Sequence, residues 1–179
     1  MTDPAALPPT PDEVARMIRV DQAGEYGATL IYDGQLAVMG DRGPVARSIA
    51  HMAEQEARHR ARFDAMIAER RVRPTLLAPM WRIAGTALGA ATALMGPRAA
   101  MACTAAVETE IDRHYGQQLD RLVDSDPELS ATIADFRAEE AEHHAQAIAA
   151  GAEQTPGYPL LSAVIRLGCR AAIRLSERI

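Results

Sequence analysis

The chain repeats one arrangement of acidic residues and histidines after an interval of 83 or 84 positions. Three pairs share this interval: Glu25 with Glu108, Glu56 with Glu140, and His59 with His143. The first pair is 83 residues apart and the other two are 84 residues apart. Each half of the chain therefore contains a glutamate followed by a Glu-x-x-His motif, which predicts an internal repeat of a helix pair, because Glu and His at positions i and i+3 share one helix face.

These residues lie on stripes that are otherwise apolar when the sequence is read at steps of three and four. The stripes are residues 14–39 with Glu25, 45–66 with Glu56 and His59, 101–122 with Glu108, and 129–150 with Glu140 and His143. Four helices would thus direct four glutamates and two histidines inward. The hydrophobic content of 48% with only 4% aromatic residues is typical of such a helical bundle. We predict an all-α four-helix bundle with an internal two-fold repeat.

Four carboxylates in an apolar interior require compensation. Each uncompensated buried ion costs several kcal/mol, and neighbouring carboxylates also repel one another. Two divalent cations would neutralise four glutamates, and oxygen-rich ligands with one imidazole per metal suit iron or manganese. One Glu from each of two helices plus Glu-x-x-His from two others is the ligand set of ferritin-like di-iron and di-manganese bundles. The six residues are therefore predicted metal ligands.

Other polar residues near the motifs need separate interpretations. His144 also lies close to the inward face, but the repeat selects His143. His114 and Tyr115 fall near the inner face of the third stripe, either as a packed core pair or in a supporting proton or electron role. Residues predicted to be solvated or at the surface are His51, Glu54, Glu139 and Glu142.

Capping signals place the helices. Thr10-Pro11-Asp12-Glu13 begins a helix that can run to Gly40. A second helix runs from near Pro44 to near Arg73-Pro74. A later helix begins at the start signal Asp126-Pro127 and ends near Gly151. The last helix covers about residues 160–174. Residues 1–10 are expected to form a flexible tail, and residues 11–179 a single domain.

Charge and cysteine content exclude some classes of function. The net charge of −5 gives no overall basic footprint for nucleic acid. Cys103 and Cys169 lack C-x-x-C spacing and are expected to be free thiols in a reducing compartment. The N-terminal residues show neither signal-peptide nor transit-peptide features, so a cytosolic start is expected.

The segment 76–107 is unusually apolar. Its longest uncharged run, residues 83–97, is too short and too rich in glycine for a secure membrane span. One interpretation is a buried helix or broken helix. The other is a hydrophobic surface that contacts a bilayer or admits an apolar substrate, with Trp81, Arg82 and Arg98 as interfacial anchors.

Several blocks within about residues 16–179 are distinctive: DQAGEYGA, RVRPT, ALGAATALMG, AMACTAAVE, EEAEHH and GCRAAIRLSERI. Together they resemble the demethoxyubiquinone hydroxylases of ubiquinone biosynthesis. The resemblance implies a ferritin-like bundle with apolar and C-terminal accessory helices. It also implies two iron ions, bridged by Glu56 and Glu140, with Glu25 and Glu108 each binding one.

By the same resemblance, the chain would be an O2-dependent monooxygenase that hydroxylates the ring of demethoxyubiquinol. One oxygen atom would become the ring hydroxyl and the other would leave as water. The substrate would carry a polyprenyl tail, and NADH would be the reductant, although no Gly-rich dinucleotide fingerprint follows a strand here.

The resemblance further implies peripheral association with a membrane, at the cytoplasmic face of the cell membrane of a bacterium. Other ubiquinone-biosynthesis proteins and a second copy of the chain are candidate partners. Two alternatives remain open from sequence. A ferritin-like ferroxidase or peroxide-handling protein would share every ligand, and a non-catalytic membrane-associated helical scaffold would use the acids structurally.

Overall fold

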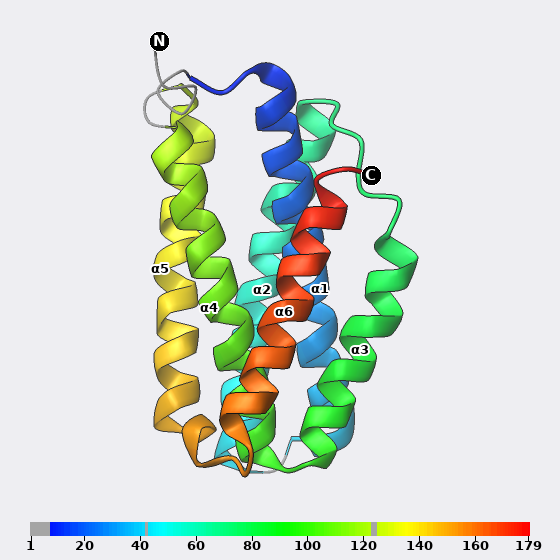
Figure 1. Cartoon of the computed structure of the whole chain (residues 1–179), viewed down its shortest axis with the longest axis vertical. Helices are drawn as coiled ribbons and strands as arrows, with labels where there is room; N and C mark the ends of the chain where they lie inside the picture. The colour runs from blue at the N-terminus through cyan, green and yellow to red at the C-terminus, as the bar shows by residue number, and fades with distance from the viewer. Residues whose placement is uncertain (1–7, 42, 123–124) are drawn as a thin grey trace.

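The computed structural model describes residues 8–41, 43–122 and 125–179. Within these residues it contains six α-helices, one short 3-10 helix and no β-strand (Figure 1). In chain order they are α1 (Pro11–Met39), α2 (Pro44–Glu69), α3 (Ala78–Leu94), α4 (Pro97–Leu122), α5 (Pro127–Ala149), η2 (Ala152–Gln154) and α6 (Tyr158–Ser176). The predicted all-α fold is confirmed. Most of the predicted tail, residues 1–7, lies outside the described residues.

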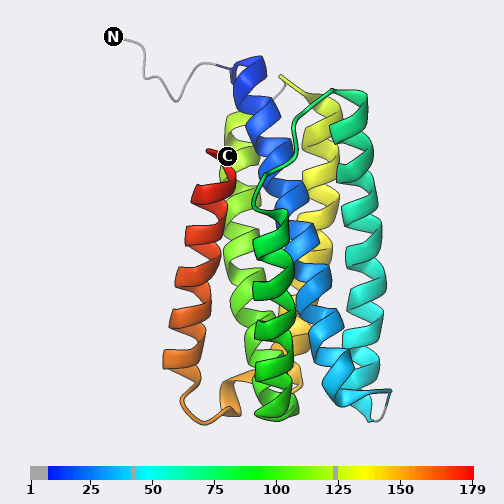
Figure 2. The ribbon, with the colours of Figure 1, turned by 90° about the vertical axis from the view of Figure 1, so that its right-hand side faces the viewer.

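Helices α1, α2, α4 and α5 run alongside one another as a four-helix bundle, with α3 and α6 on its outside (Figures 1 and 2). Helices α2 and α3 both pack against α1, while α5 and α6 both pack against α4. Each half of the chain thus arranges its second and third helices around its first in the same way. The ferritin-like bundle with accessory helices is confirmed, and its repeat includes three helices per half rather than the predicted two.

The first bundle helix begins at the predicted signal. Thr10 accepts a hydrogen bond from the Glu13 backbone N–H, and the Glu13 carboxylate accepts one from the Thr10 backbone N–H, which completes a capping box. The helix ends at Met39, and Gly40, with a φ of 64°, is its C-cap. Helix α5 likewise begins after Asp126, whose carboxylate accepts from the Leu129 backbone N–H at 3.1 Å.

Helix α2 ends four residues earlier than the predicted end near Arg73-Pro74. Arg71 adopts a left-handed backbone with φ of 54°, and the Val72 N–H donates to the Ile67 carbonyl at 3.0 Å. This i to i−5 bond closes the last turn as a Schellman motif. Val72 is 8% exposed, so burying its side chain draws the backbone out of the helix before the proline does.

The apolar segment 76–107 is a broken helix, but the interpretation of a helix buried in the core holds only for its second part: residues 99–107 of α4 are buried, whereas α3 lies outside the bundle with Ile83 72% and Leu94 76% exposed. The break lies at Gly96, where φ is 111°, directly before Pro97 begins α4. Glycines let α3 approach the backbone of α1 closely, because a Cβ at Gly89 would overlap the Ile31 carbonyl and one at Gly34 would overlap the Thr86 carbonyl. The glycine content of this segment therefore serves helix packing. Among the described residues, none of the helices is both long and apolar enough to cross a membrane.

Both cysteines are free, as their sequence context and spacing predicted, and they lie in one apolar cluster with Ile165. Cys103 is buried, whereas Cys169 is only half-buried. Burial raises the pKa of each thiol to about 12, which keeps both protonated and poorly reactive.

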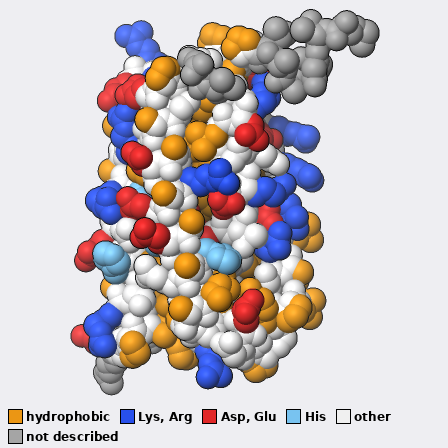
Figure 3. Space-filling model, turned by 90° about the vertical axis from the view of Figure 1, so that its left-hand side faces the viewer, with side chains coloured by type: hydrophobic (Ala, Val, Ile, Leu, Met, Phe, Trp, Pro, Cys, Tyr) orange, Lys and Arg blue, Asp and Glu red, His pale blue; other side chains and the backbone are white. Residues whose placement is uncertain are grey.

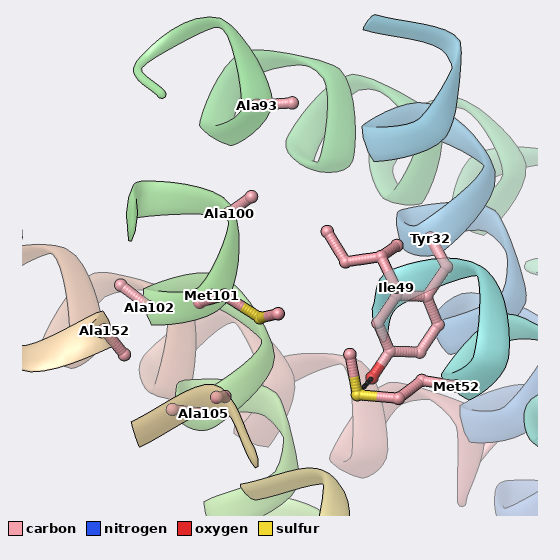
Figure 4. Packing of buried hydrophobic residues seen from close by; sticks show 10 residues of the cluster. Tyr32, Ile49, Met52, Ala93, Ala100, Met101, Ala102, Ala105 and Ala152 are labelled. Carbon is pink, nitrogen blue, oxygen red and sulfur yellow. Dashed lines mark hydrogen bonds between the residues drawn. The ribbon is translucent and has the colours of Figure 1, made fainter. Parts of the chain in front are cut away.

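Small side chains on α4 leave room for a large phenol in the core. Figure 4 shows Tyr32, Ile49 and Met52 facing Met101 of α4, with Ala102 turned to the other side of the helix toward Ala152. Tyr32 is 2% exposed, and its hydroxyl oxygen lies 4.0 Å from Met52 Sδ. The ring fills the core, and its hydroxyl reaches the polar cluster at the centre of the bundle.

Candidate metal centre

All six predicted ligands meet in the interior of the bundle. Each is at most 1% exposed. They form two overlapping groups in which one ligand atom from each residue lies within 4.8 Å of the others: Glu25, Glu56, His59 and Glu140 in one, and Glu56, Glu108, Glu140 and His143 in the other. Glu56 and Glu140 belong to both groups, which is the position predicted for residues that bridge two ions. We call these six residues the cage.

Both imidazoles turn the same nitrogen toward the cage. Nδ1 of His59 lies 3.0 Å from Glu140 Oε1 and 3.6 Å from Glu25 Oε2. Nδ1 of His143 lies 2.9 Å from Glu140 Oε2 and 3.2 Å from Glu56 Oε1. Glu140 thus lies between the two imidazoles, and Nδ1 is the nitrogen available to a cation on each side.

Burial and crowding perturb the ionisation of the cage. Burial raises the pKa of Glu56 and of Glu108 well above the ordinary value, and the charge of Glu140 raises both further. Burial also disfavours charge on Glu140, but hydrogen bonds from His143 and His59 outweigh it and lower the Glu140 pKa to about 2. Burial disfavours charge on His59 as well, yet Glu140 and Glu25 raise its pKa to about 10. Without cations, the cage therefore retains protons.

The cage fits divalent cations. Among the described residues, four carboxylate oxygens that point into this buried space lack a hydrogen-bond partner: Glu25 Oε2, Glu56 Oε1, Glu56 Oε2 and Glu108 Oε2. A buried oxygen without a partner is costly, and cation ligation would satisfy it. The oxygen-rich donor set with two imidazoles suits iron or manganese.

Two tyrosines donate hydrogen bonds to Glu25 and Glu108, which we call the outer acids, and each bond joins one half of the chain to the other. Tyr32 on α1 donates to Glu108 Oε1 on α4 at 2.9 Å, and Tyr115 on α4 donates to Glu25 Oε1 on α1. Burial and the nearby carboxylates raise the pKa of both phenols well above the usual value, so both remain donors. Tyr115 was a predicted supporting residue. Tyr32 was interpreted only as part of an apolar stripe, although the 83-residue interval that relates it to Tyr115 could have identified it.

His114 does not join the cage. Its Nε2 lies 3.2 Å from the buried Asp21 Oδ1, and Gln118 Nε2 donates to the same oxygen at 2.8 Å. Burial raises the pKa of Asp21, against the effect of these hydrogen bonds. His114 and Gln118 line a polar cavity of about 630 Å³ near the start of α1 and the end of α6. The proton or electron role suggested for His114 stays a prediction, and Asp21 was not identified from the sequence.

The structure corrects one of the residues predicted to be solvated. Glu139 is half-buried, and its Oε2 lies 3.3 Å from His59 Nε2. The same oxygen accepts a hydrogen bond from Gln55 Nε2 at 2.8 Å. The prediction failed because Glu139 points off the stripe of α5 but toward α2, which only the packing of the two helices reveals. His51, Glu54 and Glu142 are exposed as predicted, and His144 is half-buried outside the cage.

An apolar cavity of about 420 Å³ lies between α1, α3, α4 and α6. Its lining includes Gly24 and Ala28, which flank Glu25 along α1, and Val107, which precedes Glu108 on α4. Trp81 also lines it and donates from Nε1 to Ser176 Oγ at 3.2 Å, which connects α3 with the end of α6. A volume of this size is typical of a small-molecule site.

A ferritin-like bundle whose interior collects four carboxylates and two imidazoles is the architecture of the carboxylate-bridged dinuclear metalloproteins. The chain belongs to the family described as ubiquinone biosynthesis protein COQ7, whose model matches residues 12–176. The resemblance to this family seen in the sequence is thereby confirmed.

Individual relatives support the same assignment. The chain is 53% identical over 176 residues to a 3-demethoxyubiquinol 3-hydroxylase of Rhodospirillum rubrum, covering 98% of this chain and 80% of the relative. It is 51% identical over 169 residues to the mitochondrial NADPH-dependent 3-demethoxyubiquinone 3-hydroxylase of Mus musculus, covering 92% of this chain and 77% of the relative. The identity to the correspondingly named protein of Homo sapiens is 49% over 170 residues, covering 93% and 78%.

Proposed function

We propose that the chain is an O2-dependent hydroxylase that acts on the ring of demethoxyubiquinol in ubiquinone biosynthesis, with two iron ions held by the cage. The observation that carries the proposal is the meeting of all six ligand candidates in the interior of a chain of this family. The printed names of the relatives supply the substrate class and the reaction.

The residues of the chain would hold the metal ions, fix the ligands in place and exclude water. When bound, a pair of ferrous ions would supply electrons to O2 and activate it for insertion into a ring C–H bond. Glu56 and Glu140 would span both metal positions, and the phenols of Tyr32 and Tyr115 would fix the outer acids in place. The apolar surroundings would exclude bulk water from the reacting ring.

The reaction balances with one external two-electron donor. The quinol ring gains one oxygen atom from O2 as a hydroxyl, and the second oxygen atom takes two electrons and two protons and leaves as water. We propose a reduced nicotinamide nucleotide as the donor. NADH was the expectation from the family resemblance, and the mammalian relatives are named NADPH-dependent, so both nucleotides belong in the assay.

We propose that the apolar cavity between α1, α3, α4 and α6 receives the quinol. Its walls include residues next to Glu25 and Glu108, which would bring a ring in the cavity near the cage. The polyprenyl tail would leave along α3 and α6, where large hydrophobic side chains are exposed. They are Met80, Ile83, Leu94, Leu160, Val164 and Leu167.

The same exposed side chains support peripheral association with a membrane. On the face shown in Figure 3, acidic and basic side chains are intermixed, whereas on the outer surfaces of α3 and α6 Ile83 is 72% exposed and Leu160 is 72% exposed. Apolar area of this kind, beside the exposed Arg82 and Arg98, favours an interfacial location. We propose the cytoplasmic face of a bacterial cell membrane as the location. Partner proteins of the pathway, or a second copy of the chain, would be further candidates for this surface.

The test is metal analysis followed by turnover. We expect about two irons per chain and conversion of a short-tailed demethoxyquinol to its ring-hydroxylated product, with reductant and O2 consumed in equal amounts. Glu56→Ala and Glu140→Ala should abolish iron binding and turnover while the helical circular dichroism is retained. Oxidation of ferrous iron without any hydroxylated quinone would favour the ferroxidase, and protein without iron after anaerobic loading would favour the scaffold.

A further inference from the structure

The outward-facing nitrogens of the two cage imidazoles are hydrogen-bonded to two different kinds of side chain. His59 Nε2 lies 3.3 Å from Glu139 Oε2, and His143 Nε2 lies 3.1 Å from Gln55 Oε1. Gln55 Nε2 lies 2.8 Å from the same Glu139 oxygen. The four side chains thus form one continuous chain of hydrogen bonds between α2 and α5.

Gln55 and Glu139 occupy equivalent positions of the internal repeat. They are 84 residues apart, and each directly precedes the glutamate of a Glu-x-x-His motif. The repeat pairs identical residues at the cage itself and at the tyrosines that bond its outer acids. At this pair it instead places a neutral amide behind one imidazole and a carboxylate behind the other.

Ligation fixes the direction of these hydrogen bonds. An imidazole that binds a cation through Nδ1 carries its proton on Nε2, so each Nε2–H is a donor. His59 then donates to Glu139, and His143 donates to the Gln55 carbonyl oxygen. Gln55 has only its amide N–H left for Glu139, so both ends of the amide are used and its orientation is determined.

Glu139 is more than an exposed charge beside a histidine. Its side chain is 29% exposed, and its Oε2 accepts from His59, from Gln55 and from Arg58 Nη2 at 3.2 Å. A carboxylate that accepts the imidazole N–H raises the basicity of the ligating nitrogen and fixes the ring orientation. The neutral oxygen of Gln55 accepts a weaker hydrogen bond, because charge-assisted bonds are roughly twice as strong as neutral ones.

We infer that Glu139 and Gln55 are positioning residues that make the two metal positions of the cage unequal, with the position beside His59 the stronger site. The inference rests on the proposed function only in requiring that the cage binds two cations. Glu139 strengthens the donor at one position directly, and its hydrogen bond with Gln55 holds the amide that orients the imidazole at the other.

The test uses three isosteric variants: Glu139→Gln, the exchange of both residues as Gln55→Glu with Glu139→Gln, and Glu142→Gln as a matched control. Glu142 is exposed on the same helix. Each protein, freed of metal, is titrated anaerobically with Co²⁺ by absorption, and separately loaded with ⁵⁷Fe²⁺ for Mössbauer spectroscopy. Helical circular dichroism establishes that each variant is folded.

For the wild type and the control we expect two binding steps and two quadrupole doublets of equal area. Glu139→Gln should weaken the tighter step by about tenfold or more, the effect typical of outer partners of metal-ligating histidines, and the two doublets should converge. The exchange variant should recover two separate doublets, because it restores one carboxylate and one amide in reversed order.

Unchanged doublets in Glu139→Gln would overturn the inference, even if its affinity fell, because a purely structural role would leave the two positions as unequal as before. This failure is distinguishable from failure of the proposed function. Wild-type protein that binds no metal would refute the metal centre itself, whereas wild-type protein with two ions and an unaltered variant spectrum would refute only the inequality.

Discussion

The protonation of single residues decides how far the buried carboxylates of the metal-free cage destabilise the folded protein. Four glutamates share a space in which burial and the charge of Glu140 raise the pKa of Glu56 and Glu108, so the metal-free cage must hold protons or positive imidazole. His59 supplies that positive charge beside Glu140 and Glu25. The stability of the metal-free protein should therefore depend on pH in a way that cations remove.

We predict that metal-free protein loses stability between about pH 6.5 and 10. The pKa of His59 is raised from 6.5 to about 10 in the folded state, so its contribution is fully present below pH 6.5 and is lost as pH rises toward 10. The raised pKa values of Glu56 and Glu108 act in the same direction. Thermal melts with chelator across this range should show a falling Tm, at about 2–4 °C per kcal/mol for a chain of this size.

Protein loaded with two divalent cations is the comparison for that experiment. Its Tm should vary much less over the same range, because a cation bound at Nδ1 replaces the proton whose loss otherwise makes stability depend on pH. A metal-free Tm that is flat from pH 6.5 to 10, or that rises, would contradict the assignment of charge to His59.

The hydroxyl groups of the two tyrosines that donate to the outer acids should contribute equally to the affinity for metal. Removing either hydroxyl, by Tyr32→Phe or Tyr115→Phe, leaves the ring packing intact but removes a buried hydrogen bond to a cage carboxylate. We expect the affinity for the metal on the affected side to fall by about tenfold, the equivalent of about 1.4 kcal/mol. Isothermal titration with Co²⁺ would measure it.

Tyr26→Phe is the matched control for the tyrosine pair. Tyr26 follows Glu25 directly in the sequence, and its ring lies 4.7 Å from the Arg60 guanidinium carbon, so the variant keeps that contact. Equal loss of affinity in all three variants would show that the effect is not specific to the hydroxyls of Tyr32 and Tyr115.

At the scale of helices, the close approach of α3 to α1 depends on glycines at the contact. We predict that Gly89→Ala lowers the free energy of unfolding by about 1–3 kcal/mol, because its Cβ would overlap the Ile31 carbonyl and the helices would have to separate. Gly168→Ala on α6, where a Cβ meets nothing within 4 Å, should instead be neutral or stabilising by up to about 1 kcal/mol. Urea denaturation of both variants measures the difference, and equal stability would contradict the packing account.

At the scale of the whole molecule, the sequence predicted the bundle and the six cage residues because their periodicity is a property of each helix alone. Hydrogen bonds between helices were harder to foresee. Gln55 and Glu139 lie off their stripes, and only the relative rotation of α2 and α5 brings them behind the imidazoles. The role of Tyr32 could have been predicted, because the sequence repeat pairs it with Tyr115. The early end of α2 also depended on a tertiary contact, the burial of Val72.

The exposed apolar surfaces of α3 and α6 lead to a prediction about membranes. Ile83 is 72% exposed and Leu167 is 65% exposed, so replacing both with glutamate should remove apolar area without disturbing the core. We expect the double variant to bind phospholipid vesicles at least tenfold more weakly in a flotation assay, because each charge opposes insertion into the interface.

The turnover of a short-tailed, water-soluble demethoxyquinol by the double variant should be retained, while turnover of a long-tailed quinol presented in vesicles should fall. Ala131→Glu, which adds charge to an exposed position of α5, should change neither vesicle binding nor turnover. Vesicle binding that is equal in all three proteins would contradict a membrane-facing role for these two helices and would leave their apolar surface to a protein partner.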